Sequence, residues 1–204
     1  MDPIRNPAVE AFVSQIGPEL VVAQVQIRRT ARGYELRRRD DAGCRSDELR
    51  ALELVDLRAI AQFTAEGVFR PLKSAPTLRS GWRFEASSDA ALAAALDRLY
   101  PGAIADWYAA LGADPPVTDF RVVAARQSGM YRITAKLADE QVAVVIGATC
   151  PPTQCLKRRW WSVSGLAPDP ADEKSLIPCL EPCAILMEAA RQAVRREQRN
   201  EAAS

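Results

Sequence analysis

Four of the five cysteines stand in two close pairs in the C-terminal third of the sequence. Cys150 and Cys155 enclose Pro-Pro-Thr-Gln, and Cys179 and Cys183 enclose Leu-Glu-Pro, which gives the pattern C-x4-C-x23-C-x3-C. Paired cysteines of this kind are typical of metal centres or of redox chemistry. We therefore expect the four thiolates to converge on one centre.

The spacing leaves the identity of that centre open. Structural zinc sites usually place paired ligands about two to four residues apart, which both pairs satisfy. Iron–sulfur sites tolerate less regular spacing and commonly have proline beside a ligand, as at Cys150, Cys179 and Cys183. Thiols or disulfides without a metal are the third alternative. Cys44 lies among charged residues far from the pairs, which favours a thiol outside the site.

Other chemistry is restricted by the absence of histidine. Ser-His-Asp and Cys-His catalysis, Cys2His2 zinc sites and histidine-ligated haem are all excluded. The sequence also lacks a Walker A motif and a G-x-G-x-x-G motif. These absences leave enzymatic activity undecided and favour a protein that is not an enzyme by itself.

The composition, with 48% hydrophobic and 26% charged residues over 204 positions, is that of a folded chain with a real core. The 27 basic and 26 acidic residues give a net charge of +1, so we expect neither nucleic acid nor a membrane as a partner. The N-terminal sequence has no apolar stretch suited to a signal peptide or a membrane span. We expect a cytoplasmic protein, in which clustered cysteines point to metal or redox chemistry.

The elements next to the cysteines are expected to be helices. Asp139 and Glu140 open an apolar helix that is expected to end at Gly147, shortly before Cys150, and Cys183 opens the last helix. The N-terminal end of a helix favours an anionic sulfur at Cys183. The pattern also predicts a helix capped by Thr118 and Asp119, a short extended segment at 130–133 and a strand at 158–163.

The upstream half alternates strand and helix signals. Residues 20–39 predict a hairpin, 46–66 a helix with a short strand near 52–55 as the alternative, and Trp82 with Phe84 a further strand. Ser88 and Asp89 predict a helix to Tyr100, followed by a second one to Leu111. We expect an α+β fold of two small mixed domains, residues 1–112 and 113–204, the second built around the four-cysteine site.

A basic turn leads into the strand predicted at Trp82 and Phe84. It contains four cations and one aromatic side chain, which together suit the binding of carboxylate or phosphate groups: Arg70, Lys73, Arg79, Arg83 and Trp82. The alternative is a proline-braced crossover in which Trp82 is buried and the charges are solvated.

Several segments together resemble a known family. They are FRPLKSAPTLRSGWR at 69–83, LYP at 99–101, ARQSGMYR at 125–132, DEQV at 139–142 and the four paired cysteines. The chain resembles the iron–sulfur cluster binding domain, with its preceding stabilising domain, that follows the CbiX-type sirohydrochlorin chelatase domain in certain bacterial proteins. The resemblance covers most of the chain and implies a [4Fe-4S] cluster with Cys150, Cys155, Cys179 and Cys183 as its ligands.

The sequence departs from that arrangement in one respect. We expect this chain to act without a chelatase domain of its own, and the histidines that a metal-inserting site normally uses are absent from it. The resemblance therefore implies an electron-transfer or redox accessory protein, associated with tetrapyrrole (cobalamin or sirohaem) biosynthesis and acting with a redox partner or a protein of that pathway. The competing hypothesis is a zinc-stabilised interaction module without redox activity.

Overall fold

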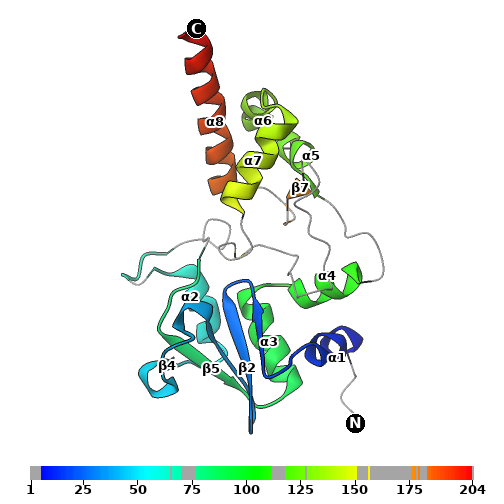
Figure 1. Ribbon diagram of the computed structural model, residues 1–204, viewed down its shortest axis with the longest axis vertical. Coiled ribbons are helices and arrows are strands. Elements are labelled where there is room, and N and C mark those ends of the chain that lie inside the picture. The colour runs from blue at the N-terminus through cyan, green and yellow to red at the C-terminus, as the bar shows by residue number, and fades with distance from the viewer. Residues whose placement is uncertain are drawn as a thin grey trace. The chain divides into compact units, whose positions relative to one another are not determined.

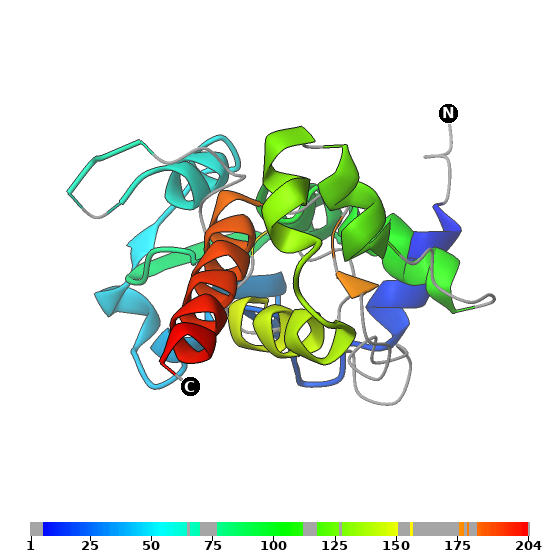
Figure 2. The same cartoon turned by 90° about the horizontal axis from the view of Figure 1, so that it is seen from above.

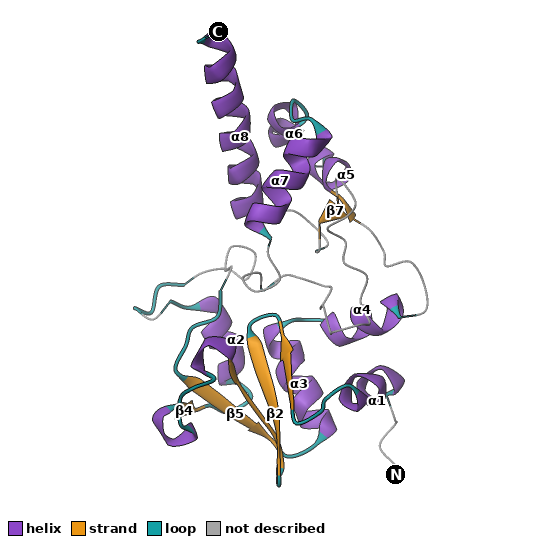
Figure 3. Cartoon of the chain, in the orientation of Figure 1, coloured by secondary structure: helices purple, strands orange, loops and turns teal. Residues whose placement is uncertain are grey.

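The computed structural model describes residues 6–64, 66–69, 77–111, 118–126, 128–150, 156, 176–177, 179 and 183–203. The chain folds into two compact units, residues 1–115 with 152–167 and residues 116–151 with 168–204. The first unit combines helices with a five-stranded sheet, and the second consists mainly of helices (Figure 3). This mixed content confirms the expected α+β fold class.

The sheet of the first unit has the order β1-β2-β3-β5-β4. The strands β1 (Glu19–Val22), β2 (Val25–Thr30) and β3 (Gly33–Arg38) form an antiparallel meander, and β5 (Trp82–Ala86) continues it antiparallel to β3 (Figure 1). The edge strand β4 (Arg50–Ala51) runs parallel to β5. The predicted single hairpin over 20–39 is thus two hairpins, because the backbone at Ala23 adopts a left-handed conformation (φ 49°) and reverses the chain there.

One face of this sheet carries the core. Ile27, Leu36 and Phe84 lie opposite one another in register, and each is buried. Helices α1 (Pro7–Ser14), α2 (Asp56–Gln62), α3 (Asp89–Leu99) and α4 (Ala103–Ala110) contribute side chains to the same core. The rings of Phe12 and Trp107 meet edge to face there, with centroids 5.6 Å apart. Side chains alternate along a strand, so the intervening residues of β3 and β5 point to the opposite face.

The sequence predictions for this unit have mixed outcomes. The helix after Ser88 is confirmed, and the Ser88 hydroxyl accepts a hydrogen bond from the Ala91 amide at 3.2 Å. The expected helix over 46–66 is wrong in its first half, which contains a 3₁₀ turn (Ser46–Glu48) and β4. Among the described residues of this range, Asp56–Gln62 form the α-helix. Another 3₁₀ turn, Arg39–Asp41, follows β3.

The second unit consists of β6 (Thr118–Asp119), α5 (Phe120–Ala125), α6 (Ser128–Thr134), α7 (Asp139–Thr149), β7 (Leu176–Ile177) and α8 (Ala184–Ala202). Helix α8 contacts α6 and α7, and Figure 2 shows α7 and α8 side by side. The predicted helix starts at Asp119, Asp139 and Cys183 are confirmed. The extended segment expected at 130–133 is wrong, because these residues belong to α6.

The strand predicted at 158–163 lies outside the described residues. Within the parts that the structure describes, no helix combines the length and the apolar character needed to cross a membrane.

Candidate metal centre

Cys150 lies at the C-terminal end of α7. Its amide donates to the carbonyl oxygen of Ile146 at 2.8 Å, which continues the helical hydrogen bonding by one residue. Val142 and Val145 bury one side of α7, and Cys150 itself is only 7% exposed. The apolar helix therefore carries its terminal thiol into the interior of the second unit.

Cys179 follows the short strand β7. This strand pairs antiparallel with β6, with Thr118 opposite Ile177 and Asp119 opposite Leu176. Ile177 is fully buried and Cys179 is 6% exposed. A two-residue ladder thus ties the segment before Cys179 to the start of α5, where the Asp119 carboxylate accepts the amides of Arg121 and Val122.

Cys183 is the N-cap residue of α8. Its sulfur accepts a hydrogen bond from the amide of Leu186 at 3.5 Å, the contact that a serine or aspartate oxygen makes at other N-caps. The unpaired amides and the dipole at a helix N-terminus stabilise negative charge. The start of α8 therefore directs a backbone hydrogen-bond donor at the sulfur of a candidate ligand.

The three described cysteines of the two pairs belong to one hydrophobic core. Cys150 and Cys179 are buried members of it, and Cys183 packs against it. The side chains around them come from helices α5, α7 and α8 and from β7, with Tyr131 of α6 packed against the same core, and they include Phe120, Val123, Val142, Val145, Ile177, Leu186, Met187 and Ala190. Such an environment limits the access of water to bound metal and sulfur.

Two polar contacts fix the helices that present the thiols. The Arg121 guanidinium forms an ion pair with the Asp139 carboxylate (Nη2–Oδ1 2.9 Å), which ties α5 to the first residue of α7. The Gln141 side-chain amide donates to the carboxylate of Glu197, which ties α7 to α8. These contacts hold the elements that end at Cys150 and begin at Cys183.

The donor set fits a thiolate-bound group, but the structure does not show a completed site. Cys155, the fourth predicted ligand, lies outside the described residues. Among the residues that are described, no three His, Cys, Asp or Glu side chains are grouped closely enough to hold a metal ion. Cys44 is exposed on the loop after the first 3₁₀ turn, in the other unit, and the described cysteines are thiols rather than disulfides.

The predicted anion-binding residues do not form a single described cluster. Arg70 and Lys73 lie outside the described residues. Arg79 lines a cavity of the first unit together with Trp82, whereas Arg83 lies on the opposite face of the sheet and pairs with the carboxylate of Glu85. Trp82 is buried, at 2% exposure, as the proline-braced alternative predicts.

Two arginines that the sequence pattern does not single out line the same cavity as Arg79. They are Arg38, at the end of β3, and Arg50, on the edge strand β4. The alternation of β3 indicates that Arg38 shares a face with Leu36, but Arg50 reaches the cavity through the long-range pairing of β4 with β5. A single sequence carries no local signal for that pairing.

The comparisons with known proteins match both parts of the chain. Residues 7–111 match the model of the DR2241 stabilising domain, and residues 112–192 match that of a 4Fe-4S iron-sulfur cluster binding domain. No curated protein matches the sequence.

A solved structure is also similar. It is DR2241 from Deinococcus radiodurans, described as a multi-domain protein with structural similarity to chelatases and with two additional novel domains. The similarity has a TM-score of 0.62 at 27% identity and covers 93% of this chain. The chain spans 40% of the length of that relative.

Proposed function

Because the chain belongs to the family of the DR2241 stabilising domain and its remainder matches a 4Fe-4S iron-sulfur cluster binding domain, we propose that it binds a [4Fe-4S] cluster through Cys150, Cys155, Cys179 and Cys183. The observation that carries this assignment is the shared core of the second unit. It brings three cysteines from the end of α7, the segment after β7 and the start of α8 into one apolar environment.

The residues of the chain prepare the site in two ways. The backbone amide of Leu186 is directed at the sulfur of Cys183, and such N–H···S hydrogen bonds stabilise negative charge on a cluster and its ligands. The burial of Cys150 and Cys179 keeps water away from their sulfurs. When bound, a cluster of this kind supplies one-electron exchange.

We assign an electron-transfer or redox accessory role to this centre. Ligation by four cysteines leaves no open coordination position on iron, so a substrate has no iron to bind directly. A reducing compartment such as the cytoplasm suits this site, because oxidation of the paired thiols to disulfides would remove the ligands. The physiological partner is then a redox protein.

A link to tetrapyrrole biosynthesis forms the finer part of the proposal. Its support is the similar structure, a multi-domain protein described as structurally similar to chelatases. The present chain spans 40% of the length of that protein. We therefore propose an accessory role for it beside a chelatase, the enzyme that inserts the metal.

The test is the content of iron, acid-labile sulfide and zinc, with a visible absorption spectrum, in protein purified without oxygen. About four irons and four sulfides per chain, with a broad band that dithionite bleaches, support the proposal. About one zinc without sulfide would replace it with the zinc-stabilised interaction module.

Single serine variants then identify the ligands. Cys150→Ser, Cys155→Ser, Cys179→Ser and Cys183→Ser are each expected to lower the iron and sulfide content. Cys44→Ser is the matched control, because Cys44 is an exposed thiol that does not belong to the core shared by Cys150, Cys179 and Cys183. Full iron content in any of the four variants would remove that cysteine from the ligand set.

A further inference from the structure

The first unit contains a cavity of about 420 Å³ that is lined by arginine side chains and by the ring of Trp82. We propose that this cavity binds a small organic polyanion that carries carboxylate or phosphate groups. Every described residue that lines it belongs to the first unit, and none of these residues is a cysteine. The site therefore goes beyond the cluster proposal, and each of the two can fail without the other.

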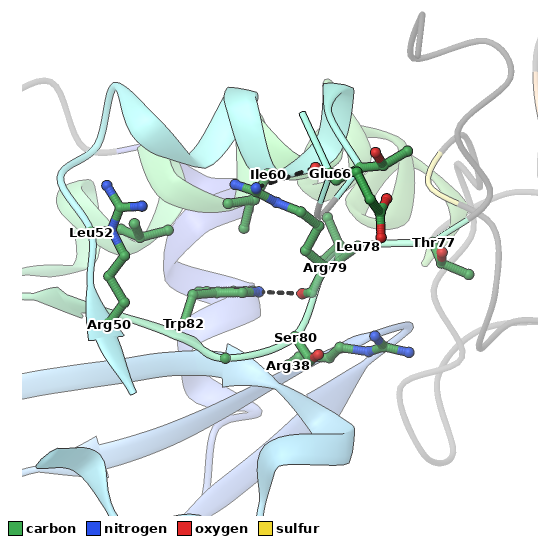
Figure 4. Close-up of a pocket in the computed structure, with 12 residues that line it drawn as sticks. Arg38, Arg50, Leu52, Ile60, Glu66, Thr77, Leu78, Arg79, Ser80 and Trp82 are labelled. Carbon is green, nitrogen blue, oxygen red and sulfur yellow. Dashed lines mark hydrogen bonds between the residues drawn. The ribbon is translucent and has the colours of Figure 1, made fainter. Parts of the chain in front are cut away.

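The wall of the cavity comes from elements that are far apart in the sequence. It is formed by the end of α2, the turn at 77–81 before β5, and the ends of β3 and β4. The register of β4 on β5 places Arg50 opposite Trp82. The Trp82 indole donates to the carbonyl oxygen of Arg79 at 2.8 Å, which fixes the backbone of the turn (Figure 4). The sheet therefore positions Arg50, and the buried Trp82 ring fixes the turn that carries Arg79.

Arg79 has a charge that the described residues do not compensate. Its guanidinium makes one long hydrogen bond, from Nη1 to the carbonyl oxygen of Thr64 at 3.4 Å, and its Nε is buried without an acceptor. No carboxylate forms an ion pair with it among the residues described. A partly buried guanidinium in this state is destabilising unless an anion approaches it.

The other two arginines differ from each other. Arg50 is exposed and has no ion pair within the described part of the chain, whereas Arg38 pairs with Asp40 through Nη2 and Oδ2 at 2.7 Å. In Figure 4 the head groups of Arg50 and Arg79 lie on the side of Trp82 that faces α2, and that of Arg38 points away. Arg50 and Arg79 are therefore the pair available to an anion. Glu66 also lines the cavity, and it is the one carboxylate among the described lining residues.

The lining defines the chemical class of the ligand. Guanidinium groups present forked donors that match the paired oxygens of carboxylate and phosphate. Two separate guanidinium groups favour a ligand with more than one acidic group. Leu52, Ile60 and Trp82 form the apolar part of the lining, and the volume exceeds that of a single inorganic anion. A metal cation is disfavoured by the excess of arginine.

The experiment uses the full chain and two probes, citrate as a polycarboxylate and pyrophosphate as a polyphosphate. Binding is measured by calorimetry and by the NMR signal of the Arg79 Nε–H group. We expect at least one probe to bind and to shift that signal. Citrate alone identifies carboxylate as the recognised group, pyrophosphate alone identifies phosphate, and binding of both identifies a general polyanion site.

Variants connect the binding to the cavity. Arg50→Gln and Arg79→Gln are each expected to weaken binding by about tenfold or more, since each removes a charge-assisted contact. Arg32→Gln is the matched control, because Arg32 is exposed in the same unit and does not line this cavity. Arg50 is exposed, so its variant separates loss of binding from loss of folding. Absence of a shift with both probes, or equal weakening by Arg32→Gln, would overturn the proposal.

Discussion

The Arg37 guanidinium, which is fully buried on β3, donates from Nε to Oε1 of Glu35 at 3.1 Å, two residues earlier on the same strand. The same guanidinium donates to the carbonyl oxygen of Cys44 at 2.6 Å and to the Ser46 hydroxyl at 2.8 Å. Ser46 in turn donates to the other carboxylate oxygen of Glu35 at 2.8 Å. This closed network anchors the loop after β3 to the sheet face opposite the core.

Replacement of Arg37 by methionine removes the centre of this network. The carboxylate of Glu35 then stays largely buried without its cation, and we expect the free energy of unfolding to fall by about 3–5 kcal/mol. Urea denaturation measures the loss. The control is Arg45→Met, which breaks an ion pair with Asp47. The side chains of Arg45 and Asp47 are 75% and 64% exposed. A similar loss in both variants would contradict the role given to burial.

The pH dependence of stability tests the same ion pair through the carboxylate of Glu35. Burial alone would raise the pKa of Glu35, but the hydrogen bonds from Arg37 and Ser46 and the nearby arginine charges outweigh it and lower the pKa below 4.5. A carboxylate with a lowered pKa stabilises the fold above its unfolded-state value, and this contribution is lost as the pH falls through the native value.

Glu35→Gln is therefore expected to be less stable than the native chain at neutral pH. The difference in the free energy of unfolding should shrink as the pH decreases below 4.5, and denaturation at a series of pH values measures it. A difference that is constant with pH would show that Glu35 acts through packing and not through its charge.

Replacement of Cys183 by serine and by alanine distinguishes two roles of its sulfur, as a proposed cluster ligand and as the N-cap of α8. Serine is a favourable N-cap residue, so Cys183→Ser should preserve the start of α8, whereas Cys183→Ala should lower the stability of the iron-free protein by about 1 kcal/mol relative to it. Both variants should lose iron to the same extent. Equal stability of the two iron-free variants, measured by thermal unfolding, would show that the hydrogen bond to Leu186 does not cap the helix.

Gly33 lies where β3 begins, with φ +127°, and a Cβ atom there would overlap the carbonyl oxygen of Ala86 on β5. Gly33→Ala should therefore cost about 2 kcal/mol or more, because both the backbone angle and the close approach oppose a side chain. Gly17→Ala, at a position with nothing within 4 Å of the new Cβ, is the control and should stay within about 1 kcal/mol of the native chain. Chemical denaturation measures both variants, and equal midpoints for the two would contradict this account.

Local signals in the sequence predict most helix starts and several strands correctly. The hydroxyl of Ser88 and the carboxylate of Asp119 cap helices as expected, since capping depends on neighbouring residues only. Trp82 and Phe84 alternate on a strand whose pattern is also local. The prediction for the short apolar run at 130–133 is wrong, because a run of that length fits either a strand or one turn of helix.

The two sites are accessible to sequence reasoning to different degrees. Cysteine spacing predicts a shared environment, and the structure places Cys150, Cys179 and Cys183 in one core. The sequence indicates the arginine cavity only in part. It singles out Arg79, but Arg50 joins Arg79 through the parallel pairing of β4 with β5, a contact decided by the tertiary fold.

The strand order also determines the order in which the first unit can assemble. The meander β1–β2–β3 pairs chain neighbours, whereas β5 meets β3 only after the whole stretch between Arg38 and Trp82 has been closed into a loop. Closure of that loop has an entropic cost, so the docking of β5 is the slower event. Among the described strands, the edge strand β4 pairs with β5 alone, so it joins the sheet only through β5. The cavity that contains Arg50 and Arg79 therefore requires β5 to be in place, and a chain in which only the meander has formed has no such cavity.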